Sequence, residues 1–349
     1  MQTGHMLIKK IIILIIVPGC LIFIRTNGSV AHARIAKRYL KMASLAPKNL
    51  GWAKNIRQIM HPALDRVTNG ELKLQWYWNG IMGDDKDYIE KMKANELDGA
   101  ALTPIGLIMA CPAMAVLQLP FLFNNYEEVD YIRDKMWQTF DKIAIKNGFK
   151  ILIWADQDFD QLYSVKYQMR QWTDYKQAKI VIWNGIVEKK TFAAIGMSTI
   201  SLRISNIFSA LKQEMFDTYM GPAIWVVGAQ LYPVFKYVNP IKMRYSPAGA
   251  VITINAWNLL PKSYRKGLKD VQMNEARKFC RQCRIDSQKA FQAMHKYGMQ
   301  VTKTTPDTIK ILKKKCLPLR KQFVGRLYSQ AILTELLEHL SVFRSKETE

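Results

Sequence analysis

Apolar residues follow two alternating spacings along the chain, one typical of strands and the other typical of helices. Residues 39–47 and 71–78 form short strand-like runs, while residues 50–68 between them place apolar side chains at helical spacing. Residues 84–96 begin with acidic side chains, which the positive end of a helix dipole favours, and 98–103 is a further short strand. This order of strands and helices predicts an α/β fold.

The later part of the chain continues the pattern with more strongly apolar runs. Three compact runs rich in β-branched residues predict central strands covered on both faces: 149–157, 178–183 and 250–255. Helical spacing predicts three longer helices: 127–148, 262–298 and 306–343. The lysine run at 313–315 in the last of these indicates a solvated helix face rather than a binding patch.

The N-terminal segment has the order of a secretory signal. Two lysines precede an apolar run, and Ala31 and Ala33 are small residues placed for cleavage after Ala33. We therefore expect residues 1–33 to be a signal peptide and the protein to be periplasmic. A retained membrane anchor is disfavoured, because the apolar run is shorter than the ~20 residues of a spanning helix. Lipidation at Cys20 is a second alternative, although the apolar residues after it favour a continuing signal.

Length and charge limit the classes of protein that remain. The chain has 349 residues, of which 49% are hydrophobic, and this supports a large core divided between two lobes. The formal net charge of +23 fits either nucleic acid or anionic lipid as a partner. Export argues against nucleic acid, so the charge indicates a solvated surface with a tendency to associate with membrane headgroups.

Signatures of catalysis and of metal binding are missing from the sequence. It contains no G-x-G-x-x-G, P-loop, H-E-x-x-H or G-x-S-x-G motif. Cys280 and Cys283 form a C-x-x-C pair, but it lies within a helical pattern and no second ligand pair accompanies it. We expect inert helix positions there, with a disulfide left open, and we expect a protein that is not an enzyme and needs no cofactor.

Two blocks of sequence are more specific than these general patterns. Residues 71–129 contain a Gly83–Asp84 turn, the step NELDGA at 95–100 and LPFLF at 119–123. Residues 172–218 contain the strand KIVIW and an A-L-x-x-x-x-x-D step at 210–217. In order and spacing these blocks resemble the extracytoplasmic solute-binding proteins of TRAP transporters, the DctP-type family, from about residue 39 to residue 298.

The resemblance implies a bilobal fold of the type II-like periplasmic-binding-protein class, with two α/β lobes, a hinge and long C-terminal helices. It implies closure on a small-molecule ligand in the cleft and recognition of the closed state by TRAP membrane permease subunits. The expected first lobe is 34–157 with 247–290. The expected second lobe is 158–246 with 291–349, including the C-terminal helices.

The departures from the family pattern suggest an unusual ligand. Relatives that carry organic acids place an arginine, which clamps the carboxylate, where this chain has Val181. A second polar position falls near Asp160, and an asparagine that supports the ligand falls near Gly221. Losing the clamp predicts a hydrophobic or neutral ligand, unless Arg170 or Arg203 replaces it.

Aromatic and apolar residues near the expected cleft are the remaining candidates for ligand contact. The candidates on the second lobe are Trp183, Tyr219, Met220 and Trp225, and those on the first are Trp76, Trp78, Phe121 and Phe123. For each of them, burial in the core is at least as good an explanation as ligand contact. The sequence therefore predicts the solute-binding component of a TRAP-type uptake system. A ligand sensor, a lipid carrier or an envelope or efflux accessory protein on the same scaffold is the alternative.

Overall fold

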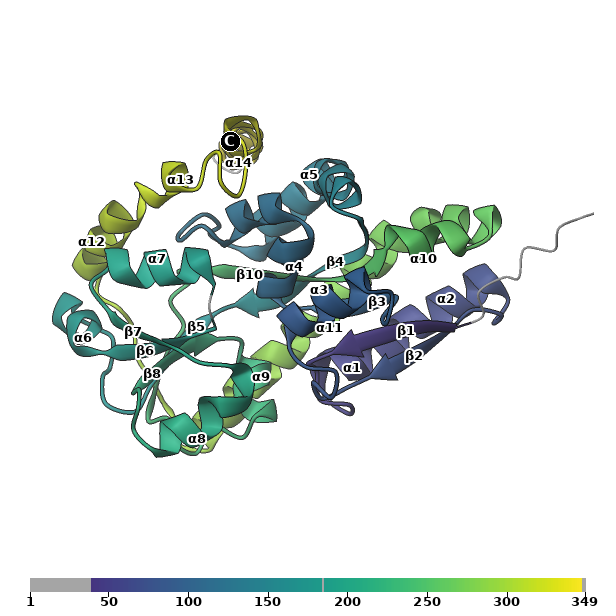
Figure 1. Ribbon diagram of the computed structural model, residues 1–349. Helices are drawn as coiled ribbons and strands as arrows, with labels where there is room; N and C mark the ends of the chain where they lie inside the picture. Colours follow the sequence, from purple (N-terminus) through teal and green to yellow (C-terminus); the bar gives the residue numbers. More distant parts are fainter. Residues whose placement is uncertain (1–38, 184, 347–349) are drawn as a thin grey trace, which may run out of the picture. The chain divides into compact units, whose positions relative to one another are not determined.

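The computed structural model describes residues 39–183 and 185–346, which all lie within one compact unit, 36–349. The predicted signal peptide and Asn184 fall outside the described residues. Two mixed β-sheets organise this unit (Figure 1). No helix in the described part of the chain is both long enough and apolar enough to cross a membrane.

The first sheet has the strand order β2-β1-β3-β10-β4. Its strands are β1 (Tyr39–Ser44), β2 (Lys73–Tyr77), β3 (Gly99–Leu102), β4 (Phe149–Phe159) and β10 (Tyr245–Thr253). β1 runs parallel to both β2 and β3, whereas β10 is antiparallel to β3 and β4. The strands predicted at 39–47, 71–78 and 98–103 are confirmed, and residues 250–253 of the predicted 250–255 strand form the end of the longer β10.

Helices that pack around the first sheet come from distant parts of the sequence. The N-terminal ones are α1 (Gly51–Asn55), the π-helical turn η1 (Ile56–Met60), α2 (His61–Thr68), α3 (Asp85–Lys93), α4 (Pro104–Ala110), the 3-10 segment η2 (Pro112–Gln118) and α5 (Tyr126–Lys146). α10 (Ile254–Leu259) and α11 (Lys262–Lys296) follow β10. Both α5 and α11 contact β4, which fits a strand covered on both faces.

The second sheet has the strand order β11-β9-β5-β8-β6-β7. Its strands are β5 (Gln161–Ser164), β6 (Lys179–Ile182), β7 (Ser198–Ser201), β8 (Thr218–Gly221), β9 (Tyr237–Asn239) and β11 (Gln300–Val301). Its helices are α6 (Trp172–Gln177), α7 (Ile186–Ala194), the 3-10 turn η3 (Ile204–Asn206), α8 (Ile207–Lys212) and α9 (Ala223–Gly228).

The chain passes between the two sheets three times. β4 continues into β5 through Asp160, β9 returns to β10 through residues 240–244, and α11 leads to β11. The first two crossings are tied together, because the Asp160 backbone N–H donates to the Arg244 carbonyl at 3.0 Å. This arrangement is the two-lobed α/β fold expected from the sequence.

The C-terminal segment differs from its prediction. In place of one helix over 306–343 there are three: α12 (Pro306–Cys316), α13 (Leu319–Gln322) and α14 (Gln330–Lys346). Pro318 lacks an N–H to continue α12, and Gly325 has a positive φ of 79° that redirects the chain. α14 contacts α5, where Arg344 pairs with Glu128 at 2.7 Å. We therefore propose to assign α14 to the first lobe rather than to the second.

Candidate functional site

The pocket with the most polar side chains lies where the first two crossings meet, and we call it the crossing pocket. Its volume is about 20 Å³, so side chains nearly fill it. The crossings contribute Asp160 and Arg244, β10 contributes Ser246, and β8 contributes Tyr219, Met220 and Gly221. The other lining residues are Pro104, Ile105, Gln118, Gln157, Trp183, Gly185, Glu188 and Pro222.

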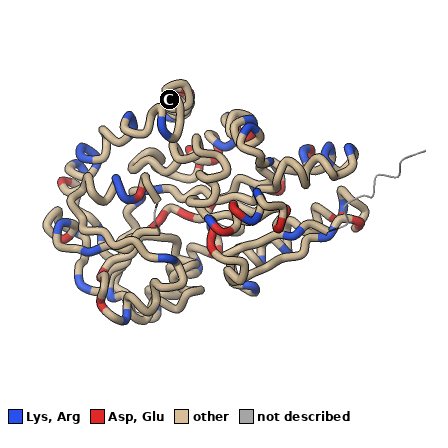
Figure 2. The backbone as a smooth tube through the Cα atoms, in the orientation of Figure 1, with Lys and Arg blue, Asp and Glu red and all other residues tan. Residues whose placement is uncertain are grey.

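Arg244 is the electrostatic centre of the crossing pocket. Its Nε and Nη2 atoms donate to Asp160 Oδ2 at 2.7 and 2.6 Å, and its Nη1 donates to Glu188 Oε1 at 3.0 Å. All three side chains are buried, and Ser246 also donates to Asp160 Oδ2. One cation therefore faces two carboxylates. Figure 2 shows Lys and Arg spread along the chain, whereas Asp and Glu gather near the middle of the view.

Glu188 is held at the start of α7. Its Oε2 accepts from the backbone N–H of Trp183 at 3.1 Å, so the carboxylate bridges the end of β6 and Arg244. Burial raises the pKa of Glu188, while Arg244 and the Trp183 N–H oppose that rise. Burial thus favours the protonated form of Glu188, and a further negative charge nearby would favour it more.

Three buried polar atoms around the pocket have no hydrogen-bond partner among the described residues. They are Asp160 Oδ1, Trp183 Nε1 and Tyr219 Oη, and all three residues line the crossing pocket. The Tyr219 hydroxyl lies over Gly221, where an added Cβ would be only 1.9 Å from it. Buried polar groups are normally paired, so two donors and one acceptor converging on one pocket indicate a site for a polar ligand.

Trp183 also separates the crossing pocket from two neighbouring hollows. One, of about 80 Å³, is lined by Trp183 and Trp225 and by residues of the loop after β1. The other, of about 440 Å³, is lined by Trp183, Arg203 and the start of α3. The Trp183 ring lies 5.1 Å from Trp225 and 5.9 Å from Tyr219, measured between ring centroids. A change in the Trp183 side chain would therefore join adjacent spaces.

The structure brings only some of the sequence-predicted residues together. Asp160, Trp183, Tyr219 and Met220 line the crossing pocket, and Trp225 lines the adjoining hollow. Their role as ligand contacts remains a prediction.

The other candidates lie elsewhere. Val181 is 1% exposed, belongs to the core of the second sheet and pairs in register with Tyr219. Trp76 and Trp78 stack at 4.4 Å beside His61 in a separate groove. Phe121 packs near Lys313, and Phe123 is buried against Tyr245.

Neither alternative arginine enters the crossing pocket. The Arg203 side chain is 63% exposed and lies 3.9 Å from Asp84, and Arg170 is exposed near the start of α6. Sequence reasoning missed Arg244 and Glu188. The available signal for Arg244 was a basic residue directly before the buried β10 strand, and for Glu188 an acid in the first turn of α7.

No metal site or disulfide accompanies this pocket within the described residues. No group of three or more His, Cys, Asp or Glu side chains there could hold a metal ion. Cys111, Cys280, Cys283 and Cys316 are buried free thiols. Burial raises the pKa of the Cys280 thiol to about 12, which keeps it protonated and unreactive. The burial of Cys280 and Cys283 fits the expectation that this C-x-x-C pair is chemically inert.

Comparison with known proteins gives consistent matches. Residues 43–326 match the bacterial extracellular solute-binding proteins of family 7, DctP. A solute-binding protein of Verminephrobacter eiseniae is 24% identical over 221 residues, which are 61% of this chain and 64% of the relative. The chain thus spans slightly less than two thirds of that relative's length.

Two solved structures share the fold. One is a TRAP periplasmic solute-binding protein from Desulfovibrio salexigens with bound orotic acid, with a TM-score of 0.81, 18% identity and coverage of 87% of this chain and 99% of that one. The other is the sugar acid binding protein DctPAm from Advenella mimigardefordensis with galactonate, with a TM-score of 0.79, 15% identity and coverage of 87% and 99%.

Proposed function

Because this chain belongs to the bacterial extracellular solute-binding proteins of family 7, the receptors of TRAP transporters, we propose that it captures a small hydroxylated carboxylic acid. Members of this family are binding proteins rather than enzymes, and they act outside the cytoplasm. The ligand would bind in the crossing pocket, and the closed receptor would deliver it to a membrane permease.

The observation that carries this proposal is the set of three unpartnered atoms in one pocket. Trp183 Nε1–H and Tyr219 Oη–H are donors suited to the oxygens of a carboxylate, and Asp160 Oδ1 is an acceptor suited to a hydroxyl. A molecule carrying both groups would satisfy all three atoms at once. A purely apolar ligand would leave each of them unpaired, at a cost of about 1–3 kcal/mol per group.

The relatives support an acid rather than the hydrophobic or neutral ligand that the sequence indicated. The similar structures hold orotic acid and galactonate, and both of these molecules are acids. The sequence-based expectation followed from the absence of an arginine at position 181. Arg244 instead supplies a guanidinium within the pocket from the crossing before β10. We therefore set the hydrophobic or neutral ligand aside.

The charge balance of the pocket makes proton uptake part of this proposal. Arg244 already faces Asp160 and Glu188, so a ligand carboxylate would be a third negative charge beside one cation. Since burial already raises the pKa of Glu188, its protonation would relieve the repulsion. The protonated Glu188 could still accept the hydrogen bond from the Trp183 backbone N–H. Arg244 could then turn one of its N–H donors to the ligand.

Entry of the ligand requires the pocket to open, because about 20 Å³ does not hold a sugar acid. Motion about the crossings at Asp160 and residues 240–244 would separate the lining residues of the two sheets. Closure on the ligand would restore their contacts, which selects the closed state. A permease that recognises both lobes would then distinguish loaded from empty receptor.

The permease subunits, export through the 1–33 segment and association with anionic membranes remain predictions. The proposed lobes are 39–159 with 245–290 and 330–346, and 160–244 with 291–329. No contact in the described residues favours a sensor, a lipid carrier or an efflux accessory over a receptor.

Calorimetry with matched ligands tests the proposal. Galactonate and galactitol share a chain of hydroxyls, and only galactonate carries a carboxylate. We expect galactonate to bind with a Kd at least tenfold lower, and Tyr219→Phe, which removes only the hydroxyl, to reduce that difference. Tyr232→Phe, outside the pocket, is the matched control. Equal binding of the two compounds, or tighter binding of galactitol, would refute the proposed ligand class.

A further inference from the structure

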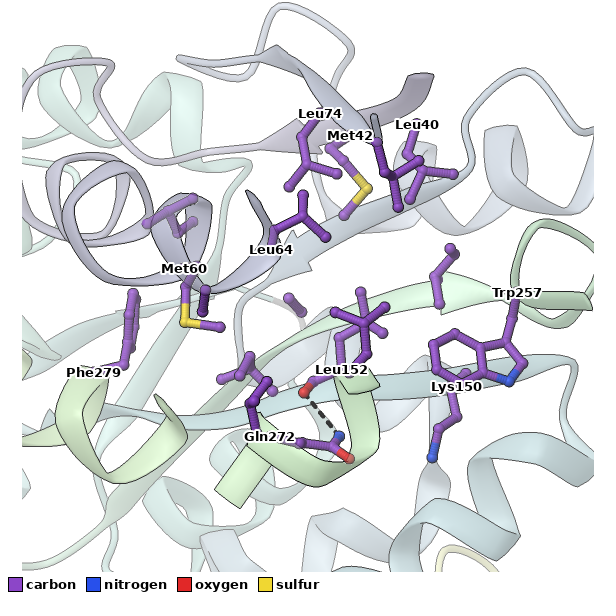
Figure 3. Close-up of a pocket in the computed structure, with 18 of the residues that line it drawn as sticks. Leu40, Met42, Met60, Leu64, Leu74, Lys150, Leu152, Trp257, Gln272 and Phe279 are labelled. Atoms are coloured by element: carbon purple, nitrogen blue, oxygen red, sulfur yellow. Dashed lines mark hydrogen bonds between the residues drawn. The ribbon is translucent and has the colours of Figure 1, made fainter. Parts of the chain in front are cut away.

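A second cavity lies within the first lobe and shares no lining residue with the crossing pocket. We call it the sheet cavity; its volume is about 90 Å³. Strands β1, β2, β4 and β10 form one wall, and α1, η1, α2, α10 and α11 form the other. In Figure 3, Leu40, Met42 and Leu74 project toward the space from one side and Leu152 from the other.

The polar lining groups at the strand β4 side of the sheet cavity are already satisfied. Lys150 pairs with Asp141, and Figure 3 shows its side chain extending away from the space between the apolar residues. Gln272 Nε2 donates to the carbonyls of Ile151 and Leu152 at 2.7 and 2.8 Å. The Lys150 charge and the Gln272 Nε2 donors are therefore already engaged within the protein.

Three tryptophans line the sheet cavity, Trp52, Trp76 and Trp257, and the indole N–H groups of the first two differ from each other. Trp76 Nε1 donates to His61 Nε2 at 3.1 Å and is satisfied. Trp52 Nε1 is buried and has no partner among the described residues. Trp52 lines both the sheet cavity and the hollow beside Trp225. An oxygen acceptor on an occupant would give this indole N–H a partner, whereas most of the remaining wall is apolar.

The helix wall contains an irregularity at the cavity itself. The turn η1 is π-helical between α1 and α2, and its residues Ile56 and Met60 both line the cavity. A π-helical turn holds an extra residue and often marks a functional site. Met42 and Met60 have unbranched, flexible side chains, so the space can adapt to a molecule larger than the void.

We propose that the sheet cavity is a second binding site, which takes a small apolar ring compound carrying at most one hydrogen-bond acceptor. Aromatic side chains in the wall, among them Trp257 and Phe279, suit the edge and face contacts of a ring. An engineered apolar cavity of about 150 Å³ stays dry and binds benzene or xenon, and the flexible Met42 and Met60 side chains would have to move for a ring to enter this smaller space. This proposal does not depend on the acid ligand of the crossing pocket.

Thermal denaturation with benzene and phenol, together with crystals under xenon pressure, tests the second site. We expect xenon in the sheet cavity and a rise in Tm with either ring compound. Ala63, on α2, is buried and lines the cavity, so Ala63→Leu fills it. This variant should reduce the rise in Tm at least fivefold. Ala94→Leu adds the same atoms at an exposed position and should keep the full rise.

Two outcomes would overturn the second site. One is the absence of xenon from the cavity together with no change in Tm of the wild type. The other is an equal rise in Tm in Ala63→Leu and in the wild type, which would place the compounds elsewhere. If Ala63→Leu does not fold, the xenon position in the wild type decides. Tyr219→Phe should leave the rise unchanged, which separates this site from the crossing pocket.

Discussion

Arg244 Nη1 donates to Glu188 Oε1 at 3.0 Å, so a residue just before β10 holds a residue of α7 across the crossing between the sheets. The same guanidinium also binds Asp160. These contacts make Arg244 both a structural residue and the cation nearest to the proposed ligand. Its two roles lead to separate predictions.

Replacing Arg244 by methionine should strongly destabilise the protein. The change leaves Asp160 and Glu188 buried without their cation, and breaking a buried pair on one side costs about 3–5 kcal/mol. Urea denaturation measures the free energy of unfolding. Arg277→Met removes a more exposed pair with Asp134 and should cost at most about 1 kcal/mol. Equal losses in both variants would contradict the importance of Arg244.

Gly221→Ala should weaken acid binding more than it weakens folding. The new Cβ would collide with the Tyr219 hydroxyl, so the ring has to move within the pocket. We expect galactonate affinity to fall at least tenfold by calorimetry. Gly228→Ala is the control, because its nearest contact would be an ordinary 3.6 Å from Pro47. Unchanged affinity in Gly221→Ala would remove the Tyr219 hydroxyl from the ligand site.

Val181→Arg should destabilise the protein. The family resemblance places a carboxylate-clamping arginine at this position, and on that basis the variant would gain affinity for an acid. Val181 is instead 1% exposed in the core of the second sheet, so an arginine there would bury an unpaired charge. We expect a loss of about 3 kcal/mol or more in denaturant unfolding. Val181→Ile should cost less than about 1.5 kcal/mol, and a well-folded arginine variant with new acid affinity would restore the earlier interpretation.

Binding of galactonate should be accompanied by proton uptake. Glu188 already has a raised pKa because it is buried, and a ligand carboxylate would raise it further. Affinity should therefore decrease as the pH rises through the pKa of the free receptor's Glu188. Calorimetry at one pH in buffers of different ionisation enthalpy measures the protons taken up. Glu188→Gln should abolish this uptake, and an unchanged value would assign the proton to another group.

Asp85 should make the protein less stable as the pH rises from about 3.8 to about 6. Burial raises the pKa of Asp85 from 3.8 to about 6, although Thr103 donates to it. The folded state thus favours the protonated carboxyl, and its stabilising effect is fully present only below about 3.8.

The Asp85→Asn variant, whose side chain is neutral at every pH, tests this predicted loss of stability. Relative to the wild type, its free energy of unfolding should improve by roughly 3 kcal/mol between pH 3.5 and pH 7, at ~1.4 kcal/mol per pKa unit. Asp65→Asn, at an exposed pair with Lys73, should show less than about 1 kcal/mol over the same range. If the free energy of unfolding relative to the wild type does not change with pH in either variant, Asp85 ionises normally.

The sequence predicted most elements of the fold because their apolar spacing is local information. Residues 84–96 contain α3, whose capping residue is Asp84, and 262–298 contain α11 almost entirely. The break after α12 was missed because amphipathic spacing continues on both sides of Pro318. Periodicity alone does not record where one helix ends and the next begins in a new direction.

The candidate site was predictable only in part. Asp160, Trp183 and Tyr219 were found through the family resemblance, which fixes their order along the chain. Arg244 contacts Asp160, which lies 84 positions earlier in the chain, and Glu188, which lies 56 positions earlier. No local spacing connects these positions. Val181 was placed at the site because the family resemblance aligns it with the arginine that clamps a carboxylate, and an alignment does not show that the side chain is buried in the core. Only the structure therefore shows how deeply Val181 is buried in the core.

The 35-residue helix α11 contacts β4 near the first sheet and α9 beside the second. At 1.5 Å per residue it is about 50 Å long, and it has no proline to act as a joint. Any rotation of one sheet relative to the other must therefore curve this helix or shift its packing at one end. Amide exchange along α11 would reveal which half yields, and so report the loading state of the receptor.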